Sequence, residues 1–155
     1  MTVWATHSFI EHDRQVLLLK KAKGLFGEGK WFVPGGKFAH GETPEQCVVR
    51  ETLEETGLRI NNPQGIGRVH FFKDGQRDSP YWSSHVFLSR EFSGRPTDGR
   101  EGKLRWFRID HLPFHEMWED DLLWVRLVFD QKKFEGWFYY TGDFEKLVDH
   151  RVVQL

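Results

Sequence analysis

Cysteine is almost missing from this sequence, since Cys47 is the only one among 155 residues. A single thiol excludes an internal disulfide bond and fits a reducing compartment. Because Cys47 falls within a predicted helix, we interpret it as a packing residue and not as a nucleophile.

Long apolar runs are missing too. No stretch approaches the roughly 20 apolar residues that a membrane-spanning helix needs. The first residues, Met1-Thr2-Val3-Trp4, lack the basic start and apolar core of a signal peptide. We therefore expect a cytoplasmic location and no membrane partner.

The chain also lacks an excess of charge of either sign, because 22 Lys and Arg stand against 23 Asp and Glu, a net charge of −1. Such a chain has no general attraction for nucleic acid or for an anionic membrane. We expect a small molecule, and not a nucleic acid polymer, as its partner. The sequence leaves open whether the chain is a monomer or a homodimer.

Aromatic residues, by contrast, are abundant, with 14 Phe and 7 Trp. Large rings bury much apolar area each, which compensates for a modest hydrophobic fraction of 39%. A length of 155 residues suits one domain, over residues 1–155, with one core.

Periodicity and turn residues predict two helices and a sheet. The predicted strands are 2–10, 15–20, 65–72, 81–90, 104–108, 134–140 and 147–154. One helix is predicted from Thr43-Pro44, a start signal completed by Gln46, to a stop at Gly57. A second is predicted over about 116–131, with a buried side made of Leu122, Val125, Leu127, Val128 and Phe129. Two helices with a mixed sheet predict an α/β sandwich.

The first predicted helix carries three carboxylates, Glu51, Glu54 and Glu55. Residues three and four apart share a helix face, so these groups fit within an arc of roughly 100°. Like charges this close repel one another, and a hard divalent cation such as Mg²⁺ or Mn²⁺ relieves the repulsion. On the helix alone, a solvated acidic face with Arg50 offsetting Glu54 is the alternative interpretation.

The loop before this helix favours the metal interpretation. Residues 32–37, Phe-Val-Pro-Gly-Gly-Lys, place paired glycines just ahead of the capped helix. Glycines let backbone amides approach a phosphate. A strand, a glycine loop and an acidic helix in succession therefore indicate a metal-dependent site for phosphate chemistry.

The same segment resembles the signature of the Nudix hydrolases. The residues in register with that signature are Gly36, Glu42, Arg50, Glu51, Glu54, Glu55, Gly57 and Leu58. Thr52 stands where the signature has an apolar residue, and its methyl group can still pack. The resemblance implies a Nudix-type α/β/α sandwich with a mixed sheet, and Mg²⁺ or Mn²⁺ as cofactor. It implies metal ligation by Gly36 and the three helix glutamates, with Arg50 orienting Glu51 or Glu54.

Outside the signature, residues 20–37, 112–121 and 132–138 are similar to the animal MutT homologues of that family, which hydrolyse oxidised purine nucleoside triphosphates. This likeness implies a further metal ligand, Glu101, ahead of the Trp106-Phe107 pair. It implies a substrate pocket made of Lys23, Phe26, Phe32, Trp118, Asp120 and Asp121. Phe32 is a departure, because that branch has an asparagine there which hydrogen-bonds the base.

Two interpretations of Asp120 and Asp121 stay open. Adjacent acids at a helix start commonly cap the helix or interact with its dipole. A partly buried pair beside Trp118 can instead share a proton and thereby read the edge of an oxidised purine.

The predicted function is Mg²⁺-dependent hydrolysis of oxidised purine nucleoside triphosphates, such as 8-oxo-dGTP, to a nucleoside monophosphate and pyrophosphate, which sanitises the nucleotide pool. Phe32 keeps open a second hydrolase function, with a nucleotide sugar or a pyrimidine triphosphate as substrate. A catalytically silent ligand sensor is a third hypothesis, and the complete set of helix glutamates argues against it.

Overall fold

Alternation of apolar and polar residues produces long strands that pair into one mixed β-sheet. The computed structural model describes residues 1–155. Its main strands are β1 (Val3–His12), β2 (Gln15–Lys21), β3 (Trp31–Phe32), β5 (Gln64–Phe72), β6 (Trp82–Ser89), β8 (Gly102–Arg108), β9 (Phe134–Thr141) and β10 (Lys146–Gln154). The strand order is β10-β9-β5-β6-β1-β2-β3, and β8 also pairs with β2. Pairing is parallel between β1 and β6 and between β5 and β9, and antiparallel elsewhere.

Several short elements were not predicted from the sequence. A second sheet joins β4 (Arg59–Asn61) to β7 (Glu91–Ser93), and single 3-10 turns form η1 (Ile109–His111) and η2 (Phe114–Glu116). Elements of two or three residues are too short to show a hydrophobic period, which explains why the sequence pattern does not reveal them.

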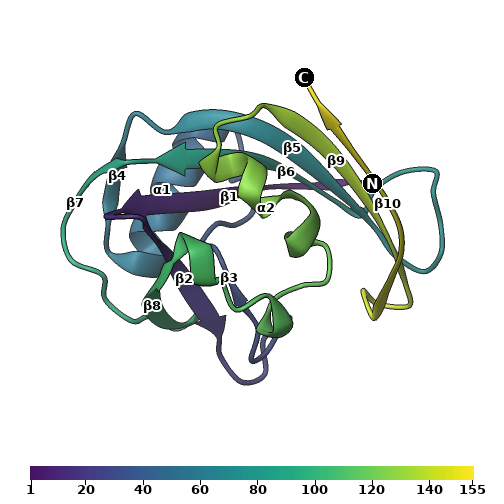
Figure 1. Ribbon diagram of the computed structural model, residues 1–155, viewed down its shortest axis with the longest axis horizontal. Helices are drawn as coiled ribbons and strands as arrows, with labels where there is room; N and C mark the ends of the chain where they lie inside the picture. The colour runs from purple at the N-terminus through teal and green to yellow at the C-terminus, as the bar shows by residue number, and fades with distance from the viewer.

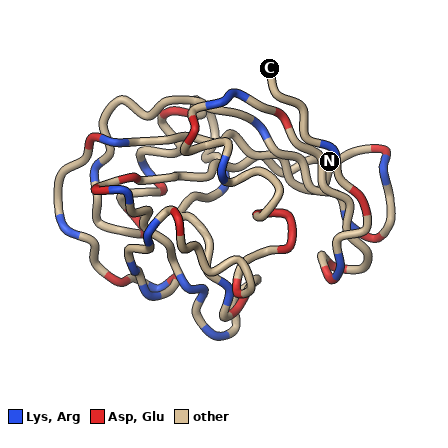
Figure 2. Tube along the Cα trace, in the orientation of Figure 1, with Lys and Arg blue, Asp and Glu red and all other residues tan.

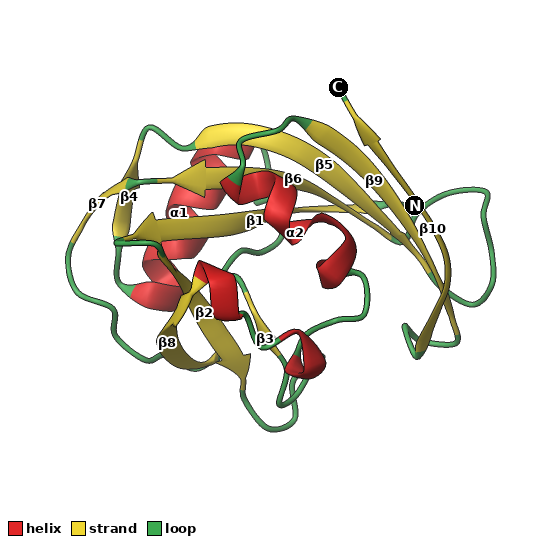
Figure 3. Cartoon of the chain, viewed as in Figure 1, coloured by secondary structure: helices red, strands yellow, loops and turns green.

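The first helix, α1 (Pro44–Thr56), has the predicted ends. Thr43 and Gln46 form a full capping box, with each side chain accepting a hydrogen bond from the other residue's backbone N–H. The helix stops at Gly57, which adopts a left-handed conformation with φ of 78°. Figure 3 shows α1 and the second helix on opposite faces of the main sheet, which confirms the predicted sandwich.

The second helix, α2 (Asp121–Phe129), is shorter than the predicted range of 116–131. Met117 has an extended backbone and Trp118–Asp120 form a turn, so the helix cannot begin before Asp121. The predicted buried side was wrong at Leu122, which is 55% exposed, while Trp124 is 1% exposed and occupies the core.

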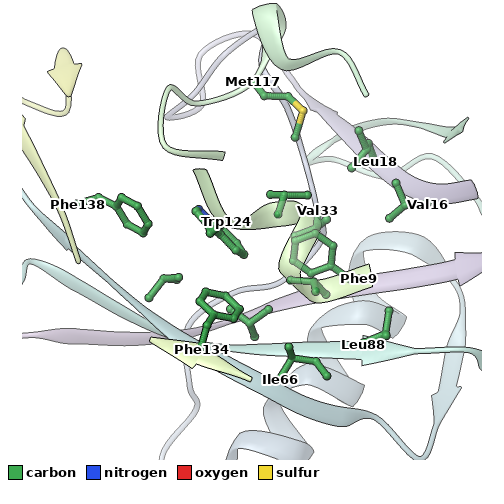
Figure 4. Close-up of a cluster of buried hydrophobic side chains, with 14 of the residues drawn as sticks. Phe9, Val16, Leu18, Val33, Ile66, Leu88, Met117, Trp124, Phe134 and Phe138 are labelled. Carbon is green, nitrogen blue, oxygen red and sulfur yellow. The ribbon is translucent and has the colours of Figure 1, made fainter. Parts of the chain in front are cut away.

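Two apolar clusters fill the two faces of the sheet. The larger one lies between the sheet and α2 and includes Phe9, Trp124, Phe134 and Phe138 (Figure 4). The smaller one includes Ile10 and lies under α1. Phe9 and Ile10 are neighbours on β1, and successive strand residues point to opposite faces, so one strand supplies both clusters.

Charged residues of both signs alternate around the molecule in Figure 2, in keeping with the small net charge. Neither helix has the length and apolar character that crossing a bilayer requires. The N- and C-termini both lie in the upper right of the view in Figure 1.

A buried hydrogen bond fixes α1 against β1. Thr52 is fully buried, and its Oγ1 donates to Ser8 Oγ at 2.7 Å. Cys47 is also fully buried on this side of α1, where its thiol donates to the carbonyl oxygen of Gly36. Burial raises the pKa of Cys47 to about 11, which agrees with a packing residue. Thr52 can thus stand where the signature has an apolar residue, because Ser8 satisfies its hydroxyl group.

Thr52→Val should lower the free energy of unfolding by about 1–3 kcal/mol, because Ser8 Oγ then loses its partner inside the core. Combining Thr52→Val with Ser8→Ala should recover part of this loss. Urea unfolding of the wild type, both single variants and the double variant measures the coupling. Strict additivity of the two single effects would contradict a Thr52–Ser8 hydrogen bond.

Candidate active site

A cavity of about 570 Å³ opens between the sheet, the loop after β2, α1 and the start of α2. Of the twelve predicted site residues, nine line it: Phe26, Phe32, Gly36, Glu51, Glu55, Glu101, Trp118, Asp120 and Asp121. Arg50, Glu54 and Lys23 do not. One cavity therefore joins the acidic part of α1 to the aromatic and acidic residues around α2.

The three helix carboxylates do not share one environment. Glu55 is 7% exposed because it continues the buried stripe of Val48 and Thr52, at positions i, i+4 and i+7. Glu51 is half-buried and also faces the cavity. The Glu54 side chain is 58% exposed and does not line the cavity, although Glu54 shares a helix face with the other two carboxylates.

Glu55 is a carboxyl group whose ionised form is disfavoured by its surroundings. Its Oε1 is buried and has no hydrogen-bond partner. Burial, together with the neighbouring Glu51, raises the pKa of Glu55 to about 9, against the opposing field of Lys21. A divalent cation would satisfy a buried, unpartnered carboxyl oxygen that lies next to a second carboxylate.

Arg50 organises the outer side of the acidic group. Its Nη1 donates to Glu51 Oε1 at 2.9 Å and to Glu54 Oε2 at 3.1 Å, the predicted contacts. Its Nε and Nη2 both donate to Glu42, and Nη2 also donates to the Lys37 carbonyl oxygen at 3.1 Å. These bonds lower the pKa of Glu42 to about 2 and raise that of Arg50.

Gly36 brings the loop into contact with α1. A Cβ atom at this position would lie 2.4 Å from Glu51 Oε2, so any larger residue would displace that carboxylate. The carbonyl oxygen of Gly36 accepts a hydrogen bond from the backbone N–H of Thr6 at 2.9 Å. Its predicted role as a metal ligand stays a prediction.

The acidic residues fit a hard divalent cation. Carboxylate oxygens are the ligands that Mg²⁺ prefers, and the unpartnered Oε1 of Glu55 points to the same requirement. No three acidic, histidine or thiol groups are already gathered at one point, since Glu51 and Glu54 are bound to Arg50. Glu51, Glu54, Glu55 and Glu101 stay the candidate ligands.

Glu101 is held by a lysine that the sequence reasoning missed. Lys21 Nζ donates to Glu101 Oε2 at 2.7 Å, and the ammonium group lies 4.8 Å from the centre of the Phe32 ring. Lys23, predicted to bind substrate, is exposed outside the cavity. Lys21 ends β2 facing the cavity whereas Lys23 belongs to the turn that follows, and the role of Lys23 toward substrate stays a prediction.

Aromatic rings form the other end of the cavity. Phe26 stacks on Trp118 with ring centres 5.2 Å apart, and the ammonium group of Lys30 lies 5.0 Å from the Trp118 ring. Flat rings with open faces suit a flat heteroaromatic ligand. Phe32 lines the same cavity and offers no hydrogen-bonding side-chain atom.

Asp120 and Asp121 are both buried at this end. Asp120 accepts hydrogen bonds from Tyr140 Oη at 2.5 Å and from Trp124 Nε1 at 2.8 Å, so both its oxygens are engaged. Asp121 Oδ2 accepts from the Trp118 backbone N–H at 3.1 Å, and the Asp121 side chain also hydrogen-bonds that of Asp120. Asp121 therefore caps the turn and also lines the cavity.

Burial raises the pKa of both acids, and that of Asp121 lies well above 3.8 because Asp120 adds its charge. The pair accordingly keeps a proton to a higher pH than an isolated aspartate would. A protonated carboxyl group donates a hydrogen bond and an ionised one only accepts, so the pair can do both.

Several polar and aromatic residues of the cavity were not foreseen, among them Trp124, His7, Ser84 and Tyr140. Trp124 follows Asp120 by four residues, a helical spacing that could have revealed it. The other three lie on strands distant in sequence, and no local pattern marks them.

Comparison with known proteins adds independent findings. A family model described as NUDIX domain matches residues 2–128. A relative from Danio rerio, described as oxidized purine nucleoside triphosphate hydrolase, is 39% identical over 138 residues, covering 89% of this chain and 86% of its own. A relative from Mus musculus with the same description is 37% identical over 127 residues, covering 82% and 80%.

A similar fold is known from a solved structure, that of a MutT protein from Bacillus halodurans. It aligns with a TM-score of 0.82 and 31% sequence identity, over 97% of each chain. The match thus covers nearly the whole chain.

The raised pKa of Asp121 predicts a pH-dependent stability. Above pH 3.8 the Asp121 carboxyl group loses its proton in the unfolded chain but keeps it in the folded chain. The free energy of unfolding therefore falls as pH rises from 3.8 up to the pKa of Asp121 in the folded chain. Relative to Asp121→Asn, the wild type should lose up to about 1.4 kcal/mol per pH unit in that window. Urea unfolding of both proteins between pH 4 and 8 tests this, and parallel pH curves would contradict it.

Proposed function

The chain belongs to the Nudix family and is a Nudix pyrophosphohydrolase, and on that premise we propose that it hydrolyses oxidised purine nucleoside triphosphates such as 8-oxo-dGTP in a Mg²⁺-dependent reaction. The products are a nucleoside monophosphate and pyrophosphate. The observation that carries the proposal is the cavity itself, which connects Glu51 and Glu55 at one end to Trp118 and Asp121 at the other.

The acidic end is suited to the phosphates. Glu51, Glu54, Glu55 and Glu101 would hold Mg²⁺, with Arg50 keeping Glu51 and Glu54 in place. The ion, when bound, neutralises phosphate oxygens and makes a water molecule more acidic. Lys21 and Lys37 line the cavity and supply the positive charge for a polyphosphate chain.

The aromatic end is suited to the base. Trp118 and Phe26 offer ring faces for stacking. Asp121 lines the cavity and would bind the edge of the base, and Asp120, held by Trp124 and Tyr140, fixes the position of its neighbour. Oxidation of guanine at C8 changes ring nitrogen N7 from an acceptor into a donor. A carboxyl pair that shares a proton can accept a hydrogen bond from the donor form of N7 and donate one to the acceptor form.

Phe32 supports a second candidate substrate class within the same family. It offers no hydrogen bond where the animal MutT homologues carry an asparagine, so a pyrimidine triphosphate or a nucleotide sugar is the alternative. Both candidates use the same acidic end and differ only in what the aromatic end accepts.

Glu55→Gln should lower kcat by at least about 100-fold. The variant should unfold no earlier than the wild type, because glutamine has no charge to desolvate and Oε1 has no partner to lose. Turnover across a Mg²⁺ titration, together with thermal unfolding, measures both effects. Removal of Mg²⁺ with EDTA should abolish wild-type turnover, and added Mg²⁺ should restore it.

Glu45→Gln serves as the matched control, since Glu45 is an exposed glutamate on the first turn of α1. It should retain wild-type turnover. Full activity of Glu55→Gln, or wild-type activity in EDTA, would refute the assignment of this end of the cavity.

Asp121→Asn should reduce the preference for 8-oxo-dGTP over dGTP by about tenfold or more, because an amide cannot exchange a proton with the base. Steady-state rates on 8-oxo-dGTP, dGTP, oxidised dATP, dCTP and a nucleotide sugar measure the preference. Glu119→Gln is the control, as Glu119 is an exposed neighbouring acid outside the cavity. A wild type that prefers dCTP or the sugar nucleotide would replace the first candidate with the second.

A further inference from the structure

His7 is a cavity residue to which neither end of the proposed site assigns a task. It stands on β1 and lines the cavity beside Phe71 and Trp124, with the His7 and Trp124 ring centres 5.7 Å apart in an edge-to-face arrangement. Its Nδ1 lies 2.6 Å from Ser84 Oγ on the adjacent strand β6. Its Nε2 has no hydrogen-bond partner within the protein. One nitrogen is therefore satisfied, and the other is available to a ligand.

The chemical state of His7 follows from its surroundings. Burial among aromatic rings lowers the pKa of His7 to about 4, so the imidazole is neutral at pH 7. In a neutral imidazole one nitrogen donates a hydrogen bond and the other accepts. The Ser84 hydroxyl makes no other hydrogen bond and can either donate or accept. Ser84 thereby lets Nε2 act as a donor or as an acceptor.

The position of His7 places it next to the base end of the cavity. The indole of Trp124, against which His7 packs, donates its Nε1–H to Asp120. Only the Trp124 indole thus separates His7 from Asp120. The rings of Phe32 and Phe71, which line the same cavity, provide no hydrogen-bonding atoms. His7 is accordingly a polar group that can reach a base in an otherwise aromatic part of the cavity.

We propose that His7, oriented by Ser84, determines base specificity by hydrogen-bonding the nucleobase through Nε2. This inference rests on the proposed function, since it needs a nucleotide base in the cavity. Buried polar groups that pair with one ligand are left unpaired by another, which is how a single hydrogen bond produces discrimination. His7 compensates for Phe32, whose side chain cannot make such a bond.

The test compares the wild type with His7→Phe, which keeps a ring and removes both nitrogens. Steady-state kinetics on 8-oxo-dGTP, dGTP, dATP, dCTP and dUTP should show KM rising about tenfold more for the preferred nucleotide than for the least preferred, while kcat changes little. Calorimetric titration with 8-oxo-dGMP in the absence of metal should show a matching loss of affinity. A purely structural defect would change all substrates alike.

His85→Phe is the matched control. His85 is also partly buried with a lowered pKa, but it lies on the other face of β6, against Trp4 and Phe38. Its specificity profile should equal that of the wild type. If His7→Phe does not fold, Ser84→Ala carries the test, because loss of the hydroxyl should shift the profile in the same direction.

The outcomes separate the two proposals. A wild type without selectivity among the five nucleotides would overturn the proposed function and this inference together. A selective wild type whose profile is unchanged by His7→Phe, or by Ser84→Ala where His7→Phe does not fold, would overturn the inference alone. A base-dependent rise in KM, absent in His85→Phe, would support it.

Discussion

The hydrogen bonds of Arg50 are the interaction on which the acidic end of the cavity depends. One guanidinium group binds Glu42, Glu51, Glu54 and the Lys37 carbonyl oxygen, and so it ties the glycine loop to α1. Guanidinium–carboxylate bonds are directional and charge-assisted, which makes them suited to hold several like charges close together. Without this cation, neighbouring carboxylates on one helix would move apart, and the loop would lose its fixed distance from the helix.

Both ends of the cavity use carboxyl groups whose charged form burial disfavours. Glu55 lies at the end assigned to the phosphates and Asp121 at the end assigned to the base, and the pKa of each is raised. The consequences differ because the partners differ. Glu55 has an unpartnered oxygen beside Glu51, which suits a cation, whereas Asp121 shares its environment with Asp120 and suits exchange of a proton. Perturbed acids in one cleft are a common mark of functional sites.

Prediction from sequence succeeded where the determining contacts are local. The ends of α1 depend on Thr43, Gln46 and Gly57, all within a few residues of the backbone groups they bind. It failed for the start of α2. The helix was predicted to begin at about residue 116, whereas it begins at Asp121, after Asp120 accepts a hydrogen bond from Tyr140 on β9. Prediction from sequence also missed Lys21, which faces the cavity, and it offered no signal for His7, whose partner Ser84 is 77 residues away.

The sequence by itself determined that a capped helix carries Glu51, Glu54 and Glu55 behind a glycine loop, because helix spacing and capping act over fewer than five residues. Only the tertiary structure decided which of these carboxylates enter the cavity. That choice depends on the rotation of α1 about its axis, which Cys47 and Thr52 set by packing against β1. Contacts 41 and 44 residues apart in sequence thus turn Glu55 inward and leave Glu54 in solvent.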